Sequence, residues 1–275
     1  MYSKTAEIRA PLSTHLAQMW TKLLSESYEI LVAKMQPLKR GVVLYTYTLV
    51  MARTLTLIHF MFFYRRKMPP TSSGQITIEK TPRYFVTPEV PERIFNMSRH
   101  VKLILVTRDP VIRAISDFTQ AVSKNMYNAS LTFRMKAVRH NGDVNTHWSA
   151  ISTGMYTRHL SKWLEFFDIR NIHFVSGEQL IHSPITVLNS VEDFLGLSRY
   201  IDSTMIYFNH TRGFPCIRKP DSTPKCFRST KGRRHIRTDD GTLNKLYDFY
   251  KPYNEHFYKL TNRSFNWTFG NVRKR

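Results

Sequence analysis

The chain has 275 residues, a length that suits one large α/β domain plus a short appendage, and its hydrophobic fraction of 42% is enough for a real core. Its 41 Lys and Arg against 20 Asp and Glu give a formal charge of +21, which favours a polyanionic partner (nucleic acid, an acidic membrane surface or a sulfated polysaccharide) over a merely solvated cationic face. With only two cysteines, and no properly spaced His pair to join them, no metal site is expected.

The first 40 residues are mixed and basic, and no typical cleavable signal peptide is visible at the extreme N-terminus. Five apolar or aromatic residues recur there at helical spacing, which predicts one amphipathic helix. They are Leu23, Leu24, Tyr28, Leu31 and Met35. Residues 1–40 are therefore interpreted as a basic N-terminal segment.

Residues 41–64 form the most apolar stretch of the chain. It is long enough to cross a bilayer, for which about 20 residues are needed. Arg53 near its centre would cost roughly 2.5–3.5 kcal/mol on insertion. A membrane anchor is one interpretation, and a pair of buried strands or a core helix is the other. Because basic residues flank both ends, the charges leave the orientation of such an anchor undecided.

Residues 68–74 form a connector that contains Pro, Ser and Gly, and residues 75–78 alternate weakly in polarity, which predicts a short strand. A loop is expected over residues 79–83. A helix is expected between this loop and Lys102.

The stretch over residues 102–119 is the one around which the chain is organised. Leu103 to Val106 is a short, unbroken apolar run, the pattern of a strand buried on both faces as in a parallel sheet. Asp109 then offers an N-cap and Pro110 a first helical position. The sequence thus predicts a buried strand followed directly by a helix.

Arg108 is expected at the carboxyl end of this strand, where open α/β sheets bind ligands, with Ser116 about two turns into the helix. A guanidinium and a hydroxyl in this setting suit a phosphate, because Arg matches phosphate oxygens with two parallel hydrogen bonds. The alternative is an Arg paired with Asp109 or Asp117 at a loop. Geometry alone leaves both interpretations open.

The rest of the chain alternates between predicted strands, helices and loops, which indicates a parallel sheet flanked by helices. The predicted elements are a polar loop with a turn or two of helix over 125–145, a helix opened by Trp148 and Ser149 that runs to Phe167, a strand over 172–175, a helix from Pro184 to a stop at Gly196, a loop region over 207–235, and a helix over 239–250 that Pro252 interrupts.

Two cysteines, Cys216 and Cys226, lie in this loop region, and one local disulfide is favoured over a reduced cytosolic pair of thiols. Five glycosylation sequons also occur in the chain. They begin at Asn96, Asn128, Asn209, Asn262 and Asn266. Five sequons with a plausible disulfide indicate the secretory lumen.

Six short motifs follow one another along the chain. They are Glu79–Phe85, Arg108-Asp109-Pro110 with Ser116-Asp117, Trp148-Ser149, Phe174–Glu178, Gly213–Cys216 and Lys231–Arg233. In this order and spacing, from about residue 68 to about residue 267, the series resembles the heparan sulfate glucosamine 3-O-sulfotransferase family. The resemblance implies a P-loop-NTPase-like sulfotransferase fold over 68–270, an α/β fold with a central parallel sheet flanked by helices and an incomplete N-terminal part, followed by a basic tail over 271–275.

The resemblance also implies an activity. This is transfer of a sulfuryl group from the co-substrate 3′-phosphoadenosine 5′-phosphosulfate to the 3-OH of glucosamine in heparan sulfate, with no metal required. The implied location is the Golgi lumen, with type II anchoring if residues 41–64 span the membrane. No nucleic-acid reader motif is recognisable, so nucleic acid is not the expected partner.

Two groups of residues fall on the family's donor contacts. Arg108 and Ser116 fall on its 3′-phosphate contacts. The second donor-binding loop corresponds to Lys231, Gly232, Arg233, Arg234 and His235. A Gly between cations lets backbone N–H groups approach an anion closely. The family has Thr where Arg234 stands, so one hydroxyl contact differs here.

Two further groups fall on the family's acceptor contacts. The acceptor segment corresponds to Lys80, Thr81, Pro82 and Arg83. Lys80 lies near the reaction centre by this resemblance, where an ammonium neutralises charge on the transferring sulfate, and the family usually carries Ser at Arg83. Trp148 and Ser149 fall on a further acceptor contact, although Trp148 suits a plain core position equally well.

The chain departs from the family pattern before residue 68. The family opens with a strand and a glycine-containing loop that holds the 5′-phosphosulfate, then a Glu-Pro-His-Phe-Phe segment that bears the catalytic base. Only Gly41 precedes Gly74, and Leu57 stands where that Glu is expected, so no catalytic base is assigned. Two hypotheses follow: an active sulfotransferase, or a non-catalytic binder of nucleotide or heparan sulfate, such as a shortened isoform or an incomplete gene model.

Overall fold

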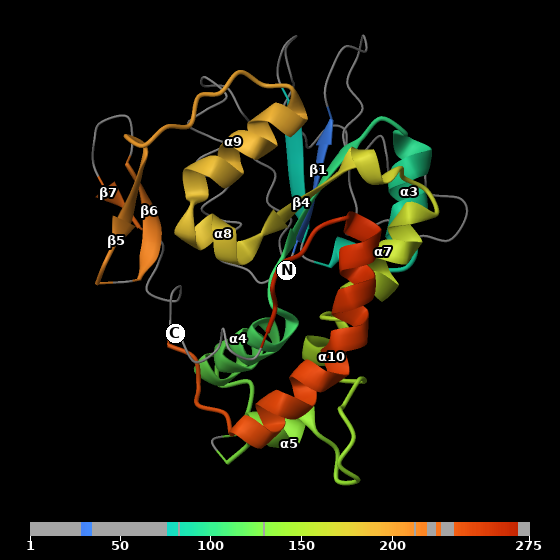
Figure 1. The fold of residues 1–275 in the computed structure, drawn as a ribbon, viewed down its shortest axis with the longest axis vertical. Helices are drawn as coiled ribbons and strands as arrows, with labels where there is room; N and C mark the ends of the chain where they lie inside the picture. The colour runs from blue at the N-terminus through green and yellow to red at the C-terminus, as the bar shows by residue number, and fades with distance from the viewer. Residues whose placement is uncertain are drawn as a thin grey trace. The chain divides into compact units, whose positions relative to one another are not determined.

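A computed structural model of the chain describes residues 29–34, 76–81, 83–128, 130–211, 213–218, 224–226 and 234–268 (Figure 1). The chain divides into two compact units. The first, called the sheet unit below, comprises Met1–Thr107 and Trp163–Gly232, and the second, called the helical unit, comprises Arg108–Lys162 and Arg233–Arg275.

A four-stranded sheet in the order β2-β1-β3-β4 organises the sheet unit. The strands are β1 (Glu29–Lys34), β2 (Thr77–Thr81), β3 (Lys102–Thr107) and β4 (Ile172–Ser176). β3 and β4 pair in parallel, whereas β1 is antiparallel to both of its neighbours. The α/β fold is confirmed, but the sheet is mixed, because β2, β3 and β4 run one way and β1 runs the other.

The helix predicted through Leu31 and Met35 is wrong where the structure describes it, because Glu29–Lys34 is the strand β1. Its central four residues form a continuous apolar run, which periodicity alone does not assign to helix or strand. Pairing on both sides, with β2 and with β3, satisfies the backbone of this segment as a strand. The same pairing extends β2 through Thr81, where a loop was expected from Glu79.

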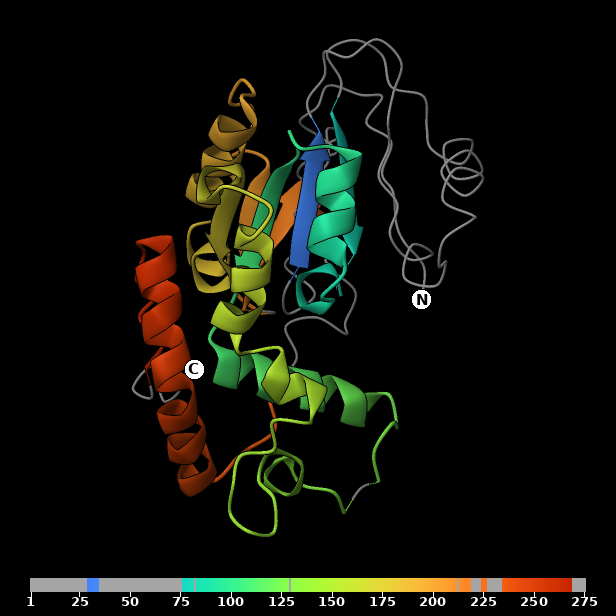
Figure 2. The ribbon, with the colours of Figure 1, turned by 90° about the vertical axis from the view of Figure 1, so that its right-hand side faces the viewer.

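Helices cover both sides of this sheet, with α8 (Gly177–His182) and α9 (Pro184–Leu195) on one side and α3 (Val90–Met97) on the other (Figures 1 and 2). The buried residues between the sheet and α8 and α9 include Ile104, Val106 and Val191. Near α3, the indole of Trp163 donates a hydrogen bond of 3.1 Å to the carbonyl of Phe85. Two short 3-10 helices complete the unit, η1 (Tyr84–Val86) and η2 (Ile169–Asn171).

The predicted end of α9 is confirmed, because Gly196 has a φ of 74° in the left-handed region. The loop predicted over residues 207–235 is wrong in part. It contains a small antiparallel sheet of β5 (Ile206–Asn209), β6 (Phe214–Arg218) and β7 (Pro224–Lys225). The predicted Cys216–Cys226 disulfide is confirmed, and it joins β6 to the residue after β7.

The helical unit is built on α4 (Pro110–Ser123), α6 (Ser149–Ser152) and α10 (Asp240–Thr261). α5 (Phe133–Ala137) and the beginning of α7 (Tyr156–Leu164) complete it. The predicted single helix from Ser149 to Phe167 is wrong, because the structure has two helices, α6 and α7, separated by a short non-helical stretch that contains Gly154. A Cβ on Gly154 would lie 2.8 Å from the Cβ of Pro110, the first residue of α4, so only glycine fits at this position.

α10 continues through Pro252, where an interruption was expected. Buried residues on both sides of the proline, Tyr250 before it and Phe257 after it, keep the helix packed across the missing N–H. The helix ends at Asn262, which has a φ of 49° in the left-handed region.

Among the described residues, no helix has the length and apolar character needed to cross a membrane. The stretch over residues 41–64, for which an anchor was one interpretation, lies outside the described residues.

Candidate functional site

Arg108 lies between β3, which ends at Thr107, and α4, which begins at Pro110. The predicted cap of α4 is confirmed, because Oδ1 of Asp109 accepts hydrogen bonds from the N–H groups of Val111 (2.9 Å) and Ile112 (3.2 Å). The predicted strand-to-helix corner is therefore present, with Arg108 at the carboxyl end of a central strand.

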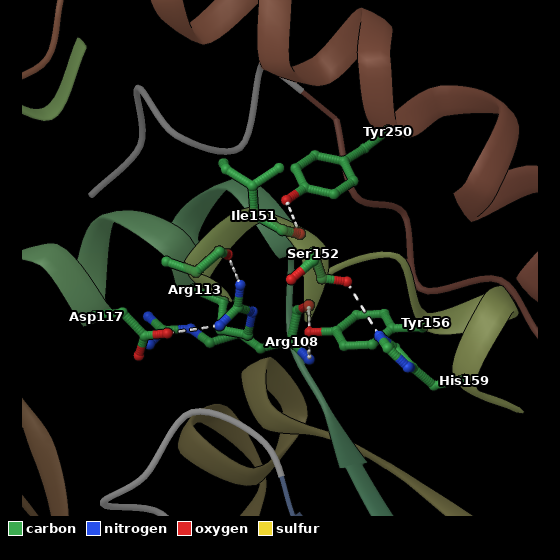
Figure 3. Close-up of polar contacts among 9 residues, drawn as sticks. Arg108, Arg113, Asp117, Ile151, Ser152, Tyr156, His159 and Tyr250 are labelled. Atoms are coloured by element: carbon green, nitrogen blue, oxygen red, sulfur yellow. Dashed lines mark hydrogen bonds and ion pairs between the residues drawn. The ribbon is translucent and has the colours of Figure 1, made fainter. Parts of the chain in front are cut away.

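The Arg108 backbone is held by Tyr156, the first residue of α7 (Figure 3). The Tyr156 hydroxyl donates to the Arg108 carbonyl at 2.7 Å, and the Arg108 N–H donates to the same hydroxyl oxygen at 3.4 Å. Tyr156 was not predictable from the sequence, because nothing in its local pattern distinguishes it from a core tyrosine. Its partner is 48 residues away along the chain.

The residue that follows the predicted second donor segment, Ile236, contacts α4 at Thr119. The N–H of Ile236 donates a hydrogen bond of 3.4 Å to the Thr119 hydroxyl, which is one turn beyond the half-buried Ser116. Arg234 and His235 immediately precede Ile236. The residue that follows the predicted segment is therefore held on the same helix that carries Ser116.

The other residues of that segment, Lys231, Gly232 and Arg233, lie outside the described residues. Arg234 is exposed, and His235 is half-buried.

A buried arginine that sequence analysis did not identify, Arg113, supports this corner from within α4 (Figure 3). It is 0% exposed, forms an ion pair of 2.6 Å with Asp117, and donates a hydrogen bond to the carbonyl of Ala150 on α6. The sequence does carry one indication of this pair: Arg113 and Asp117 are four residues apart on an otherwise apolar helix, a spacing at which side chains meet. Asp117, which the alternative interpretation of Arg108 offered as its partner, is thus paired with Arg113.

His159 on α7 also contacts the helical unit near α6. Its Nε2 atom donates a hydrogen bond of 3.0 Å to the carbonyl of Ser152 (Figure 3). Burial lowers the pKa of His159 below its ordinary value of 6.5, and the nearby Arg158 and Arg113 lower it further, while the Ser152 carbonyl raises it. The ring is consequently neutral at physiological pH.

Trp148 is a core residue, one of the two roles that the sequence allowed. Its side chain is only 9% exposed, and its ring packs edge-on against Phe133 and Phe118, with centroid distances of 5.7 and 6.1 Å. Ser149, the first residue of α6, is exposed and available to a ligand.

The predicted acceptor residues lie in the sheet unit. Lys80 is half-buried near the end of β2, Thr81 is buried at its end, and Arg83 is exposed at the start of η1. Pro82 lies outside the described residues. In place of the predicted loop, Lys80 is held in a strand by pairing with Leu31 of β1.

β1 runs away from the edge of the sheet at which β3 and β4 end. Its last residue, Lys34, lies opposite Thr77, the first residue of β2, and Ala33 lies opposite Lys102, the first residue of β3. The last residue of β1 therefore lies at the edge of the sheet opposite the one at which Thr107 lies.

Four of the five predicted sequon asparagines are exposed: Asn96, Asn128, Asn262 and Asn266. Asn209 is half-buried in β5, and its side-chain amide donates to the sulfur of Cys226 at 3.5 Å. Within the part of the chain that the structure describes, no group of three or more His, Cys, Asp or Glu side chains is arranged to hold a metal ion.

Comparison with protein families and curated proteins gives consistent matches. The sulfotransferase domain model matches residues 17–250. Human heparan sulfate glucosamine 3-O-sulfotransferase 3B1 is 50% identical over 210 residues, which cover 74% of this chain and 53% of that protein. Human heparan sulfate glucosamine 3-O-sulfotransferase 6 is 47% identical over 208 residues, which cover 74% of this chain and 60% of that protein. The chain thus spans about half the length of the curated relatives it matches.

Among solved structures, a sulfotransferase from Alicyclobacillus acidocaldarius matches with a TM-score of 0.50 at 18% sequence identity. The match covers 68% of this chain and 65% of that one. At this identity the likeness concerns the fold, and it agrees with the α/β arrangement described above.

Proposed function

The chain belongs to the sulfotransferase domain family, and from this membership we propose that it transfers a sulfuryl group from 3′-phosphoadenosine 5′-phosphosulfate to the 3-OH of glucosamine in heparan sulfate. The acceptor follows from the names of its relatives, which share 50% and 47% of their residues with the chain over the matched region. One structural observation carries the donor half of the proposal. The hydrogen bond from Ile236, the residue after the second donor segment, to Thr119 holds the chain there on α4, the helix that begins after Arg108.

In this proposal Arg108 and Ser116 bind the 3′-phosphate. A guanidinium offers two parallel N–H donors to phosphate oxygens, and a serine hydroxyl offers a third. The segment from Lys231 to His235 supplies further cations to the nucleotide. The contact of Ile236 with α4, the helix that carries Ser116, supports the proposal. Sulfuryl transfer, like phosphoryl transfer, depends on positioning and electrostatics.

Lys80 supplies positive charge to the transferring sulfate, and the neighbouring Arg83 and the exposed Ser149 contact the saccharide. The formal net charge of +21 suits a sulfated polysaccharide, which is drawn to the protein by long-range attraction. The basic surplus thus supports the acceptor class, while the precise sulfation pattern of the acceptor depends on residues such as Arg83 that differ from the family.

We also propose that the protein acts in the Golgi lumen as a glycoprotein. The Cys216–Cys226 disulfide suits an oxidising compartment. Four exposed sequon asparagines are accessible for glycan attachment, and Asn209 is the least accessible of the five. Type II membrane anchoring through residues 41–64 belongs to the same proposal.

The direct test incubates the full chain with 3′-phosphoadenosine 5′-phosphosulfate carrying radiolabelled sulfur and an N-sulfated heparan oligosaccharide. We expect label in the oligosaccharide, at the 3-OH of a glucosamine after disaccharide mapping. Donor binding without label transfer would instead support the non-catalytic binder. Label at another position would contradict the proposed regiochemistry.

A further inference from the structure

Tyr156 is a buried tyrosine whose hydroxyl meets both polar groups of one backbone residue. The hydroxyl donates to the carbonyl of Arg108 at 2.7 Å and accepts from its N–H at 3.4 Å (Figure 3). Tyr156 is 1% exposed and Arg108 is half-buried, so these contacts are partly shielded from water. Hydrogen bonds in such surroundings are costly to leave unmade.

Arg108 lies between two regular elements, at the turn from β3 into α4. The ladder between β3 and β4 ends with the pair Thr107 and Ser176. The first backbone hydrogen bond of α4 runs from the N–H of Arg113 to the carbonyl of Asp109. Arg108 lies in the two-residue turn between these patterns, and the Tyr156 hydroxyl bonds to both its N–H and its carbonyl.

The ring of Tyr156 is itself fixed within the helical unit. It packs against Phe257 on α10 and against Trp267, with centroid distances of 5.6 and 5.5 Å. Both of these residues are buried. Two aromatic neighbours therefore restrict where the hydroxyl can lie, and through it where the Arg108 peptide can lie.

We propose that Tyr156 is a positioning residue for the donor site, whose hydroxyl fixes the backbone of Arg108 so that the guanidinium is already in place for the 3′-phosphate. This inference rests on the proposed function, because it assigns Tyr156 a role through Arg108. The gain is preorganisation, since a guanidinium held in place loses less freedom when the phosphate binds.

The test compares Tyr156→Phe with Tyr250→Phe in the full chain. Both variants remove one buried hydroxyl that bonds to a backbone carbonyl of the helical unit, since the Tyr250 hydroxyl donates to Ile151 at 2.7 Å. Titrations with adenosine 3′,5′-bisphosphate and adenosine 5′-phosphate separate the 3′-phosphate from the rest of the nucleotide. We expect Tyr156→Phe to weaken binding of adenosine 3′,5′-bisphosphate about fivefold and to leave binding of adenosine 5′-phosphate unchanged. We expect Tyr250→Phe to leave the binding of both nucleotides unchanged.

The same titrations in an Arg108→Ala background complete the test. Tyr156→Phe should have no further effect there, because its role passes through the missing guanidinium. A loss that persists in this background, or one that affects both nucleotides equally, would show that Tyr156 is merely structural and would overturn the inference. If Arg108→Ala alone leaves bisphosphate affinity unchanged, the donor site itself is misassigned, and the proposed function falls together with the inference.

Discussion

The hydroxyl of Tyr247 on α10 donates a hydrogen bond of 2.7 Å to Oδ2 of Asp109, and both residues are buried. The other carboxylate oxygen of Asp109 caps α4 through two backbone N–H groups. One carboxylate thus connects α10, more than a hundred residues along the chain, to the turn that carries Arg108.

Replacing this carboxylate should cost more than removing the tyrosine hydroxyl. Asp109→Ala loses the cap and leaves the Tyr247 hydroxyl without this acceptor, so we expect the free energy of unfolding to fall by about 2–3 kcal/mol. Tyr247→Phe keeps the cap and should cost about 1 kcal/mol. Urea denaturation of both variants measures the difference. Equal losses would show that the cap contributes nothing beyond the Tyr247 contact.

Gly154 should not tolerate a side chain. Its Cβ would lie 2.8 Å from both the Cβ of Pro110 and the hydroxyl oxygen of Tyr250, closer than packed atoms approach. Gly154→Ala should lower the free energy of unfolding by about 1–3 kcal/mol through overpacking. The matched control is Gly241→Ala in the first turn of α10, where the added Cβ meets only the Asp239 carboxylate at 3.3 Å. A Gly154→Ala variant as stable as this control would contradict the close contact between α6, α4 and α10.

Acidification should destabilise the chain through His159. Burial lowers its folded pKa below 6.5, so the unfolded state takes up a proton that the native state does not. The associated stability is fully present above pH 6.5 and is lost as the pH falls through the folded pKa. The slope from one proton is at most about 1.4 kcal/mol per pH unit.

The control for this effect is His159→Gln, whose amide keeps a donor for the Ser152 carbonyl but does not titrate. Unfolding free energies of the two proteins, measured between pH 7 and pH 5, should diverge as the pH falls. Parallel curves would show that His159 does not contribute to the acid sensitivity.

The central corner of the fold was predictable because its signals are local. An unbroken apolar strand, an Asp cap and a Pro at the first helical position all fall within a few residues of Arg108, and the structure confirms each of them. The disulfide was predictable for the same reason, since its cysteines are 10 residues apart. The family resemblance used several such local motifs in order, and the comparisons confirm it.

The contacts that hold the corner were not predictable, because they join distant parts of the chain. Tyr156 reaches Arg108, and Tyr247 reaches Asp109, through side chains whose local patterns read as ordinary helix core. β1 was misassigned for a related reason, since only pairing with two distant strands makes a strand of that segment. The roles of Lys231, Gly232 and Arg233 stay predictions.

Lys80 should matter for turnover and not for donor affinity. Lys80→Ala removes the ammonium proposed to neutralise charge on the transferring sulfate, so we expect the sulfate-transfer rate to fall at least a hundredfold, roughly the cost of losing one such stabilising group. The dissociation constant of adenosine 3′,5′-bisphosphate, which lacks the sulfate, should stay within about twofold of the original, below the change expected from one lost hydrogen bond. Equal loss of both properties would show that Lys80 has been given the wrong role.

The most direct measurement for the account is calorimetric titration of adenosine 3′,5′-bisphosphate into the full chain and into two arginine variants. Arg108→Ala removes the guanidinium at the end of β3, and Arg158→Ala removes an exposed guanidinium of the same unit as a charge-matched control. We expect Arg108→Ala to weaken nucleotide binding by at least about tenfold, the loss in affinity that follows from removing one charge-assisted hydrogen bond. We expect Arg158→Ala to leave the binding nearly unchanged. An Arg108→Ala variant that binds the nucleotide as tightly as the unaltered chain would contradict the donor site.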